Sequence, residues 1–285
     1  MIDTDNSRFR YAVCEELFEN WELKDICICA RSLGYTGIEL TPGTLIGHIL
    51  RMPNEDLQYI RSIIEDNGLQ CTGLHWLLAH RTDLHLTTTD AAVRQQGWDY
   101  LRSLADVCAK LGGTYLTLGS PKQRSGPGIN PKEAASILRD GLAELASYAE
   151  ERGVVYLMEP INDPGCDVVD NMKEAVEIVR GVNHPGVATI YDFSHLANDP
   201  PPREALIQQY QAEFKHVHAT TRTGTHCGDP KTVDAEFTPI WQELRKVDYK
   251  GWISIEVFDF SAGPENIARE GAEFFQRMEE SLRGE

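Results

Sequence analysis

The sequence has few basic residues for its number of acidic ones. It contains 27 lysines and arginines against 44 aspartates and glutamates, which gives a formal net charge of −17 at pH 7. Proteins that bind nucleic acid usually carry a basic surface that neutralises the phosphate backbone, and this charge balance works against such a surface. We therefore expect no nucleic-acid partner.

Long hydrophobic runs are also missing. No stretch of about 18 or more apolar residues occurs, and the first residues, MIDTDNSRFRYAVCEEL, show no basic region followed by an apolar segment. We therefore expect neither a membrane partner nor a secretory leader. The sequence is predicted to belong to a cytoplasmic protein.

Two further signatures are absent. No GxGxxG motif follows a predicted strand and no GxxxxGK[ST] motif occurs, so nucleotide binding through a Rossmann or P-loop element is not expected. The seven cysteines are odd in number and are scattered through predicted helices and strands rather than grouped as a disulfide framework. Reduced thiols fit this distribution best.

What the sequence does contain is a repeated alternation of short apolar or β-branched runs with amphipathic stretches. Such alternation is typical of βαβ units that build a parallel sheet. Eight strands are predicted, at residues 10–14, 37–40, 70–78, 114–119, 154–159, 187–192, 214–218 and 252–257. Each is followed by a predicted helix without a Pro- or Ser-rich linker, which predicts an α/β fold, a (β/α)8 TIM barrel that forms a single domain over residues 1–285. An open, doubly wound sheet is the alternative.

Acidic residues and a histidine stand at the ends of four consecutive predicted strands. These residues are Glu159, Asp192, His218 and Glu256. The carboxyl ends of barrel strands carry the chemistry in this fold, so we expect the four side chains to converge. Three carboxylates in a low-dielectric mouth need a cation, and three oxygen ligands with one nitrogen favour Mn²⁺, with Mg²⁺ or Co²⁺ as alternatives. For each residue taken singly, the alternative is a solvent-facing side chain.

Other residues near strand ends are candidates for substrate binding. His195, three residues after the second of these strand ends, is expected on the loop above the metal; a surface or helix-capping histidine is the alternative. Glu39 is a further candidate at a strand end. His75 is expected either to contact substrate or to be a hydrogen-bonded core histidine. Lys122 begins a polar run, 122–124, that either receives an anionic substrate group or forms a solvated loop.

Seven short segments carry a resemblance to a known family: YTGIEL (35–40), GLHWLL (73–78), YLTLGSPKQRS (115–125), MEPIN (158–162), YDFSHL (191–196), KHVHA (215–219) and ISIEVFDF (253–260). With these segments in this order, the chain resembles the sugar phosphate isomerase/epimerase superfamily, which has a xylose isomerase-like TIM barrel. The superfamily includes ketose 3-epimerases, hydroxypyruvate isomerase, inosose dehydratase and endonuclease IV. The resemblance covers nearly the whole chain, and its motifs are specific for the superfamily but not for one activity.

The resemblance implies that the four strand-end residues ligate one divalent metal and that His195 lies near the substrate. In the epimerases of the superfamily an arginine holds substrate oxygens. Arg222 is its closest match here, although it stands two positions nearer the preceding histidine than is usual. The superfamily also often has an acidic residue where this chain has Gly165, and that departure argues against the standard pocket for free ketoses.

Such a site suits removal of a proton from a carbon next to a carbonyl. Glu159 and Glu256 are predicted to lie on opposite sides of that carbon, one removing the proton and the other returning it. We therefore predict a metal-dependent sugar isomerase or epimerase that acts on a keto-sugar or an oxidised sugar derivative through a metal-bound enediolate. A lyase or dehydratase that uses the same metal and the same glutamates is the main alternative.

Two other functions are less consistent with the sequence. A DNA-repair enzyme of the endonuclease IV type needs a trinuclear zinc cluster and a basic face, which the net charge of −17 disfavours. A sugar sensor without catalytic activity is disfavoured because the predicted ligand set is complete. The expected partner is therefore a small-molecule carbohydrate, and assembly into a homo-oligomer is left open.

Overall fold

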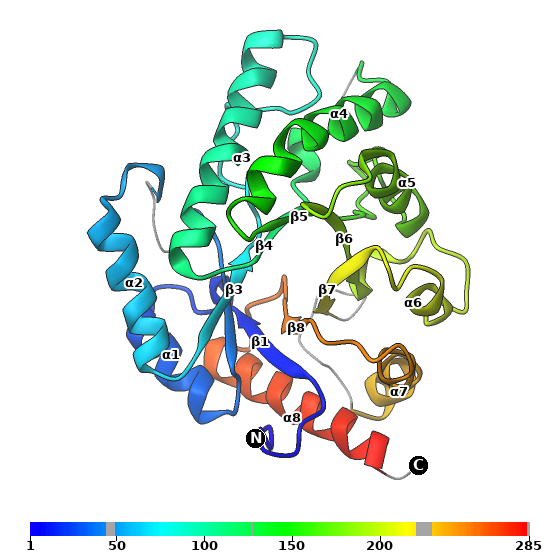
Figure 1. Ribbon diagram of the computed structural model, residues 1–285. Coiled ribbons are helices and arrows are strands. Elements are labelled where there is room, and N and C mark those ends of the chain that lie inside the picture. The colour runs from blue at the N-terminus through cyan, green and yellow to red at the C-terminus, as the bar shows by residue number, and fades with distance from the viewer. Residues whose placement is uncertain (44–48, 127, 221–229, 284–285) are drawn as a thin grey trace.

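The computed structural model describes residues 1–43, 49–126, 128–220 and 230–283, and its parallel strands close into a barrel at the centre of the molecule (Figure 1). The strands are β1 (Arg10–Cys14), β2 (Gly37–Leu40), β3 (Gln70–Leu74), β4 (Tyr115–Leu118), β5 (Val155–Met158), β6 (Val187–Asp192), β7 (Phe214–Ala219) and β8 (Trp252–Ile255). They pair in chain order, and β8 pairs with β1 to close the sheet. The predicted TIM barrel is confirmed, and the open-sheet alternative is wrong.

Helices surround the barrel; each of the first seven connects one strand to the next, and the last follows the final strand (Figure 1). They are α1 (Leu23–Ser32), α2 (Asn54–Asp66), α3 (Ala91–Leu111), α4 (Pro131–Glu150), α5 (Met172–Val182), α6 (Ala205–Gln209), α7 (Pro230–Lys246) and α8 (Pro264–Arg283). Four 3-10 turns lie between these elements: η1 (Glu15–Leu17), η2 (Ile49–Arg51), η3 (Pro121–Gln123) and η4 (Phe193–His195). Three of them, η1, η3 and η4, directly follow a strand or lie within three residues of one, and they therefore shape the carboxyl-terminal mouth of the barrel.

The helices pack their apolar faces against the outside of the strands. On α8, Phe274 and Phe275 are fully buried. The ring of Phe275 stacks on Tyr11 of β1 with a centroid distance of 4.1 Å, and Phe274 packs edge-on against Trp241 of α7. Burial of such large apolar surfaces is the main stabilising contribution to the barrel, and it provides a rigid support for the strand ends.

Parallel pairing brings the carboxyl ends of the later strands to one level. Asp192 of β6 is the register partner of His218 of β7, and His218 is the partner of Ser254 of β8. Because neighbouring strands lie roughly 4.8 Å apart, residues in register on adjacent strands are within reach of one another. The closed sheet therefore gathers residues that are far apart in the sequence.

Some strand boundaries differ from the prediction. The third strand was predicted over 70–78, but β3 ends at Leu74. Trp76 has a left-handed backbone with φ of 50°, which a strand does not accommodate, so the chain turns over the mouth of the barrel at this point. Glu159 and Glu256 likewise come one residue after the ends of β5 and β8.

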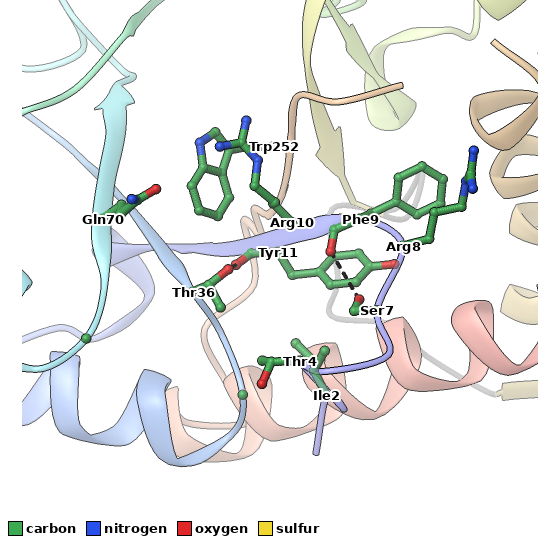
Figure 2. Close-up of a pocket in the computed structure, with 12 residues that line it drawn as sticks. Ile2, Thr4, Ser7, Arg8, Phe9, Arg10, Tyr11, Thr36, Gln70 and Trp252 are labelled. Carbon is green, nitrogen blue, oxygen red and sulfur yellow. Dashed lines mark hydrogen bonds between the residues drawn. The ribbon is translucent and has the colours of Figure 1, made fainter. Parts of the chain in front are cut away.

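A buried glutamate holds the N-terminal segment to the barrel. Oε1 of Glu279 on α8 accepts hydrogen bonds from the Ser7 hydroxyl at 2.9 Å, the Arg8 and Phe9 backbone N–H groups at 3.0 and 3.1 Å, and the Tyr11 hydroxyl at 2.8 Å. Beside this segment, at the amino-terminal end of the barrel, lies a cavity of about 360 Å³ (Figure 2). In the described part of the chain, no helix combines the length and the apolar character needed to cross a membrane.

Candidate metal centre

The structure brings the four predicted strand-end residues together. One ligand-type atom from each of Glu159, Asp192, His218 and Glu256 lies within 4.8 Å of the corresponding atoms of the other three. Asp192 and His218 are fully buried, while Glu256 is 2% and Glu159 6% exposed. The four side chains form a compact acidic cluster at the carboxyl ends of β5 to β8, and we refer to it as the acidic cluster.

His218 presents one ring nitrogen to all three carboxylates. Its Nδ1 lies 3.1 Å from Oε2 of Glu256, 3.6 Å from Oδ2 of Asp192 and 3.8 Å from Oε1 of Glu159. The distance to Glu256 is that of a hydrogen bond, while the other two are longer than a hydrogen bond allows. Nδ1 and three carboxylate oxygens therefore surround a common point.

Burial and nearby charges shift the pKa values of Glu159 and Glu256 in opposite directions. Burial, followed by the nearby carboxylates of Glu256 and Asp192, raises the pKa of Glu159 well above its usual range. Burial also acts to raise the pKa of Glu256, but contacts with His218 and His75 outweigh it and lower that pKa. The pKa of His218 is raised well above its usual value because Glu39 and Glu256 outweigh the effect of burial. The cluster therefore contains negative charge that is only partly balanced by protein cations.

The donor set fits a divalent metal ion. Oδ2 of Asp192 is buried and has no hydrogen-bond partner in the described part of the chain, and a buried carboxylate oxygen is costly unless a cation or a donor faces it. The other oxygen, Oδ1, accepts from the backbone N–H and the hydroxyl of Ser194, both at 2.7 Å, which holds the free oxygen in the cluster. Three carboxylates with one imidazole suit Mn²⁺, Mg²⁺ or Co²⁺ better than tetrahedral structural zinc.

Glu39 lies behind His218 rather than in the mouth. Its Oε1 is 3.2 Å from Nε2 of His218, and its Oε2 is 2.8 Å from Nε2 of His216 and accepts from the Ser254 hydroxyl at 2.7 Å. Both carboxylate oxygens are thus occupied, and the residue is fully buried. β2 directs the side chain of Glu39 into the barrel interior beneath the cluster, and a contact of Glu39 with substrate stays a prediction.

His75 is also enclosed by protein groups. Its Nε2 lies 2.8 Å from Oε2 of Glu16, and its Nδ1 lies 3.3 Å from Oε1 of Glu256. The neighbouring indole of Trp76 donates from Nε1 to the same oxygen of Glu256 at 3.0 Å. Both ring nitrogens are occupied and the side chain is buried, which favours the core-histidine alternative for His75, while a contact with substrate stays a prediction.

Sequence reasoning missed Glu16 and Gly119. Glu16 follows β1 in η1 and is buried, and burial raises its pKa to about 6 although the contact with His75 opposes this. A Cβ atom at Gly119, just after β4, would lie 2.1 Å from Oε2 of Glu159, so only glycine leaves room for that carboxylate. The available signal was position, because Gly119 ends the predicted strand 114–119 and Glu16 comes two residues after the predicted strand 10–14, but neither residue type is distinctive alone.

Aromatic side chains border the open side of the acidic cluster. The rings of Trp76 and Phe258 stack with centroids 6.2 Å apart, and Phe258 is 45% exposed. His195 lies on η4 with its ring 6.3 Å from that of Phe258, and its Nδ1 has no hydrogen-bond partner in the described residues. His195 is thus placed at the mouth, and its role in substrate binding stays a prediction.

The predicted basic contacts are placed differently. Lys122 is exposed on η3. Arg124 of the same run is fully buried, and it donates to the backbone carbonyls of Glu159 at 2.8 Å and Val169 at 3.1 Å. The run 122–124 therefore does not form one anion site, because Arg124 supports the loop after β5. Arg222 lies outside the described residues.

The cavity of Figure 2 is at the opposite end of the barrel from this chemistry. Its lining includes Arg10, Gln70 and Trp252, which stand at or near the starts of their strands, and no member of the acidic cluster. The guanidinium of Arg10 covers the ring of Trp252 at 4.5 Å and donates to the carbonyl of Lys250. In this fold, residues at the amino-terminal face contribute mainly to stability, so we assign the chemistry to the acidic cluster.

The protein is a closed (β/α)8 barrel in which three carboxylates and a histidine meet at the ends of β5 to β8. It therefore belongs to the class of barrels that have a metal-type site at the carboxyl-terminal mouth. Comparison of the sequence with protein-family models identifies the family within that class. The chain belongs to the xylose isomerase-like TIM barrel family, whose model matches residues 29–278. The resemblance drawn from the sequence segments is thereby confirmed.

Individual relatives are distant in sequence, but they match most of the chain. The chain is 23% identical to L-ribulose 3-epimerase of Methylomonas sp. (strain DH-1), with 71% of this chain and 69% of the relative covered. It is 24% identical to a putative hydroxypyruvate isomerase of Streptomyces coelicolor, with 84% and 87% covered. The solved structure of an L-ribulose 3-epimerase superposes with a TM-score of 0.81 at 17% identity and covers 97% of this chain and 96% of that one. That structural similarity shows the shared fold.

Proposed function

We propose that the protein is a divalent-metal-dependent sugar isomerase or epimerase that acts next to the carbonyl of a keto-sugar or an oxidised sugar derivative. The observation that carries the proposal is the acidic cluster, in which ligand atoms of Glu159, Asp192, His218 and Glu256 lie within 4.8 Å of one another. The similarity to proteins named as an epimerase and as an isomerase supports the same reaction class.

Glu159, Asp192, His218 and Glu256 would hold one divalent ion, for which Mn²⁺ is the first choice. When bound, the ion supplies positive charge that polarises the carbonyl of a sugar substrate. Oδ1 of Asp192 is hydrogen-bonded to Ser194, and Nε2 of His218 contacts Glu39. Oδ2 of Asp192 and Nδ1 of His218 are the atoms left to face the ion. These two residues would therefore serve mainly as ligands.

The two glutamates would move the proton. Glu159 is the most exposed member of the acidic cluster, and in the described part of the chain its carboxylate receives no hydrogen bond, so it is suited to approach a substrate carbon. Glu256 follows β8 whereas Glu159 follows β5, so the two glutamates reach the cluster from different sides of the barrel. One of the two glutamates, ionised, would remove the proton, and the other, already protonated, would give its own proton to the opposite face of the carbon, which would invert that centre.

Three side chains at the mouth would orient the substrate. His195 offers an unengaged ring nitrogen to a sugar hydroxyl. The stacked rings of Trp76 and Phe258 form an apolar surface of the kind that covers a sugar face and limits access of water. Contacts of substrate with Lys122 and Arg222 remain predictions.

Proton exchange tests the proposal directly. The metal-stripped protein is reloaded with Mn²⁺ and incubated in D₂O with a panel of ketoses and 3-keto-glycosides, and the sugars are followed by NMR. We expect deuterium in the recovered substrate or its stereoisomer, and loss of this exchange in Glu159→Gln and in Glu256→Gln. An unsaturated or cleaved product would instead identify a lyase or dehydratase, and the absence of both exchange and product across the panel would overturn the proposal.

A further inference from the structure

A second buried pair lies next to Glu256, and the ring of its histidine, His75, packs edge-on against His218 with a centroid distance of 5.6 Å. Glu16 comes from η1 after β1, and His75 comes from the loop after β3. Nε2 of His75 lies 2.8 Å from Oε2 of Glu16, and Nδ1 lies 3.3 Å from Oε1 of Glu256. The side chains of Glu16 and His75 are each 1% exposed, so water does not compete for these contacts.

We infer that Glu16 and His75 are positioning residues that hold Glu256 in one orientation, with Oε1 engaged by protein donors and only Oε2 directed into the proposed metal centre. The inference rests on the proposed function, because it assigns a purpose to this orientation only if a divalent ion binds in the acidic cluster. Neither Glu16 nor His75 would touch the ion or the substrate.

The contact between Glu16 and His75 determines which nitrogen of the ring carries hydrogen toward Glu256. If the shared proton is on Nε2, the ring carries hydrogen on both nitrogens; if it is on Glu16, the carboxyl O–H donates to Nε2 and the ring hydrogen is on Nδ1. In both arrangements, an N–H at Nδ1 faces Glu256. Glu16 therefore leaves a donor at Nδ1 as long as the pair holds both hydrogens, whereas a neutral ring with its hydrogen on Nε2 would leave Nδ1 without one.

Trp76 supplies a second donor to the same oxygen. Its indole N–H reaches Oε1 of Glu256 at 3.0 Å, and its backbone adopts φ of 50°, a left-handed conformation that bulky residues rarely adopt. Such a backbone persists where surrounding contacts determine it, and this one directs the indole at Glu256. Oε1 thus accepts from two adjacent residues of one loop, which leaves Oε2, at 3.1 Å from Nδ1 of His218, for the cluster.

Glu159 differs from Glu256 in the number of groups that hold its carboxylate. In the described part of the chain its carboxylate receives no hydrogen bond, and its closest basic group is Nδ1 of His218 at 3.8 Å. The carboxylate of Glu256, in contrast, accepts from Nε1 of Trp76 and lies within hydrogen-bond distance of Nδ1 of His75 and Nδ1 of His218. The two glutamates of the proposed mechanism therefore differ in freedom, with Glu256 held in place and Glu159 able to adjust.

Two substitutions of His75 separate positioning from packing. Asparagine places its amide nitrogen close to the position of Nδ1, so His75→Asn keeps a donor to Glu256, whereas His75→Gln places its amide nitrogen close to Nε2 and keeps only the contact with Glu16. We expect Mn²⁺ affinity, measured by calorimetry and by electron paramagnetic resonance on metal-stripped protein, to fall roughly 10- to 100-fold in His75→Gln, as for other partners that orient a metal ligand. His75→Asn should retain most of the affinity.

A matched pair at Glu16 tests the same inference from the other end. Glu16→Gln still donates to Nε2 and so keeps the hydrogen at Nδ1, whereas Glu16→Leu provides no polar partner. We expect Glu16→Leu to lose affinity like His75→Gln and Glu16→Gln to stay close to the wild type. Thermal unfolding of the metal-free variants shows which of them fold, so that the pair at one position remains informative if a variant at the other does not.

The outcomes distinguish this inference from the proposed function. Equal losses in His75→Asn and His75→Gln, or wild-type affinity in Glu16→Leu, would overturn the positioning role while the metal centre stands. A wild-type protein that binds no Mn²⁺ would overturn both. Where an exchanging substrate is known, the same variants should lower kcat in the order of their loss of metal affinity, and the conservative variants should restore it.

Discussion

Oε1 of Glu39 lies 3.2 Å from Nε2 of His218, on the side of the imidazole opposite the three carboxylates that face Nδ1. A carboxylate behind a metal-binding histidine fixes the ring orientation and determines which nitrogen is available as a ligand. Glu39 is itself held by His216 and by the hydroxyl of Ser254. The position of His218 in the acidic cluster therefore depends on a residue that is fully buried behind the imidazole.

Removing this support should weaken metal binding. Glu39→Leu leaves Nε2 of His218 without an acceptor, and we expect the Mn²⁺ affinity to fall roughly 10- to 100-fold. Glu39→Gln retains an acceptor oxygen and serves as the control, with a smaller loss. Calorimetric titration of metal-stripped protein measures both, and unchanged affinity in Glu39→Leu would contradict the role assigned to Glu39.

Adding a methyl group at Gly119 should disturb Glu159 alone. The Cβ of Gly119→Ala would lie 2.1 Å from Oε2 of Glu159, so the carboxylate must move. We expect a loss of kcat/KM of tenfold or more, about 1.4 kcal/mol in transition-state stabilisation, with little change in the melting temperature. Gly126→Ala, where the nearest atom is 4.0 Å away, is the matched control and should retain full activity. Equal activity of the two variants would argue against Glu159 in the reaction.

The stability of the metal-free protein should depend on pH through Glu159. Burial and the carboxylates of Glu256 and Asp192 raise the pKa of Glu159 in the folded state, so the folded protein holds this proton more tightly than the unfolded chain. The stabilising contribution is fully present below the unfolded pKa of 4.5 and is lost as the pH rises above it. Relative to Glu159→Gln, the wild type should therefore lose free energy of unfolding as the pH rises above 4.5 in the presence of a chelator. Urea denaturation at several pH values measures this, and a difference that does not change with pH would contradict it.

Binding of metal should stabilise the fold by mass action. At a free Mn²⁺ concentration 100 times the dissociation constant, the free energy of unfolding should rise by about 2.7 kcal/mol, and chelation should reverse the rise. In Asp192→Asn one oxygen remains for Ser194 while the buried Oδ2 is replaced by an amide nitrogen, so this variant should fold but gain much less from Mn²⁺. An identical gain in the variant would show that the ion binds elsewhere.

Glu279 should contribute to stability without affecting the chemistry. Its Oε1 accepts four hydrogen bonds from the N-terminal segment and β1, at the end of the barrel remote from the acidic cluster. Glu279→Ala leaves these buried donors without an acceptor, and we expect a loss of about 3 kcal/mol in the free energy of unfolding. Below its melting temperature the variant should retain wild-type kcat; a loss of kcat with unchanged stability would contradict this division.

The alternation of apolar runs and amphipathic stretches was sufficient to predict the barrel. Period and order are properties of the local sequence, and parallel strands joined by helices close in few ways. The convergence of Glu159, Asp192, His218 and Glu256 could be anticipated for the same reason, since the barrel gathers every strand end at one mouth. The functional roles of these four residues remain to be tested by the experiments above.

The individual contacts could not be read from the chain. Glu39 and His75 were predicted to touch substrate, yet both are enclosed by protein partners that lie 59 to 215 positions away along the chain. Arg124, in a polar run that resembled a solvated loop, is buried against backbone carbonyls. Side-chain direction at the end of a strand depends on where the strand stops and how the next residues turn, and β3 stops at Leu74, earlier than the apolar run indicated.

The sequence by itself determined the architecture, the excess of acidic over basic residues and the set of residues able to meet at the barrel mouth, because these depend on composition, period and order along the chain. Only the tertiary structure decided which side chains face the mouth and which stand behind it. Orientation depends on pairs such as Glu39 with His218 and Glu16 with His75, whose members belong to distant parts of the chain and meet only when the sheet closes.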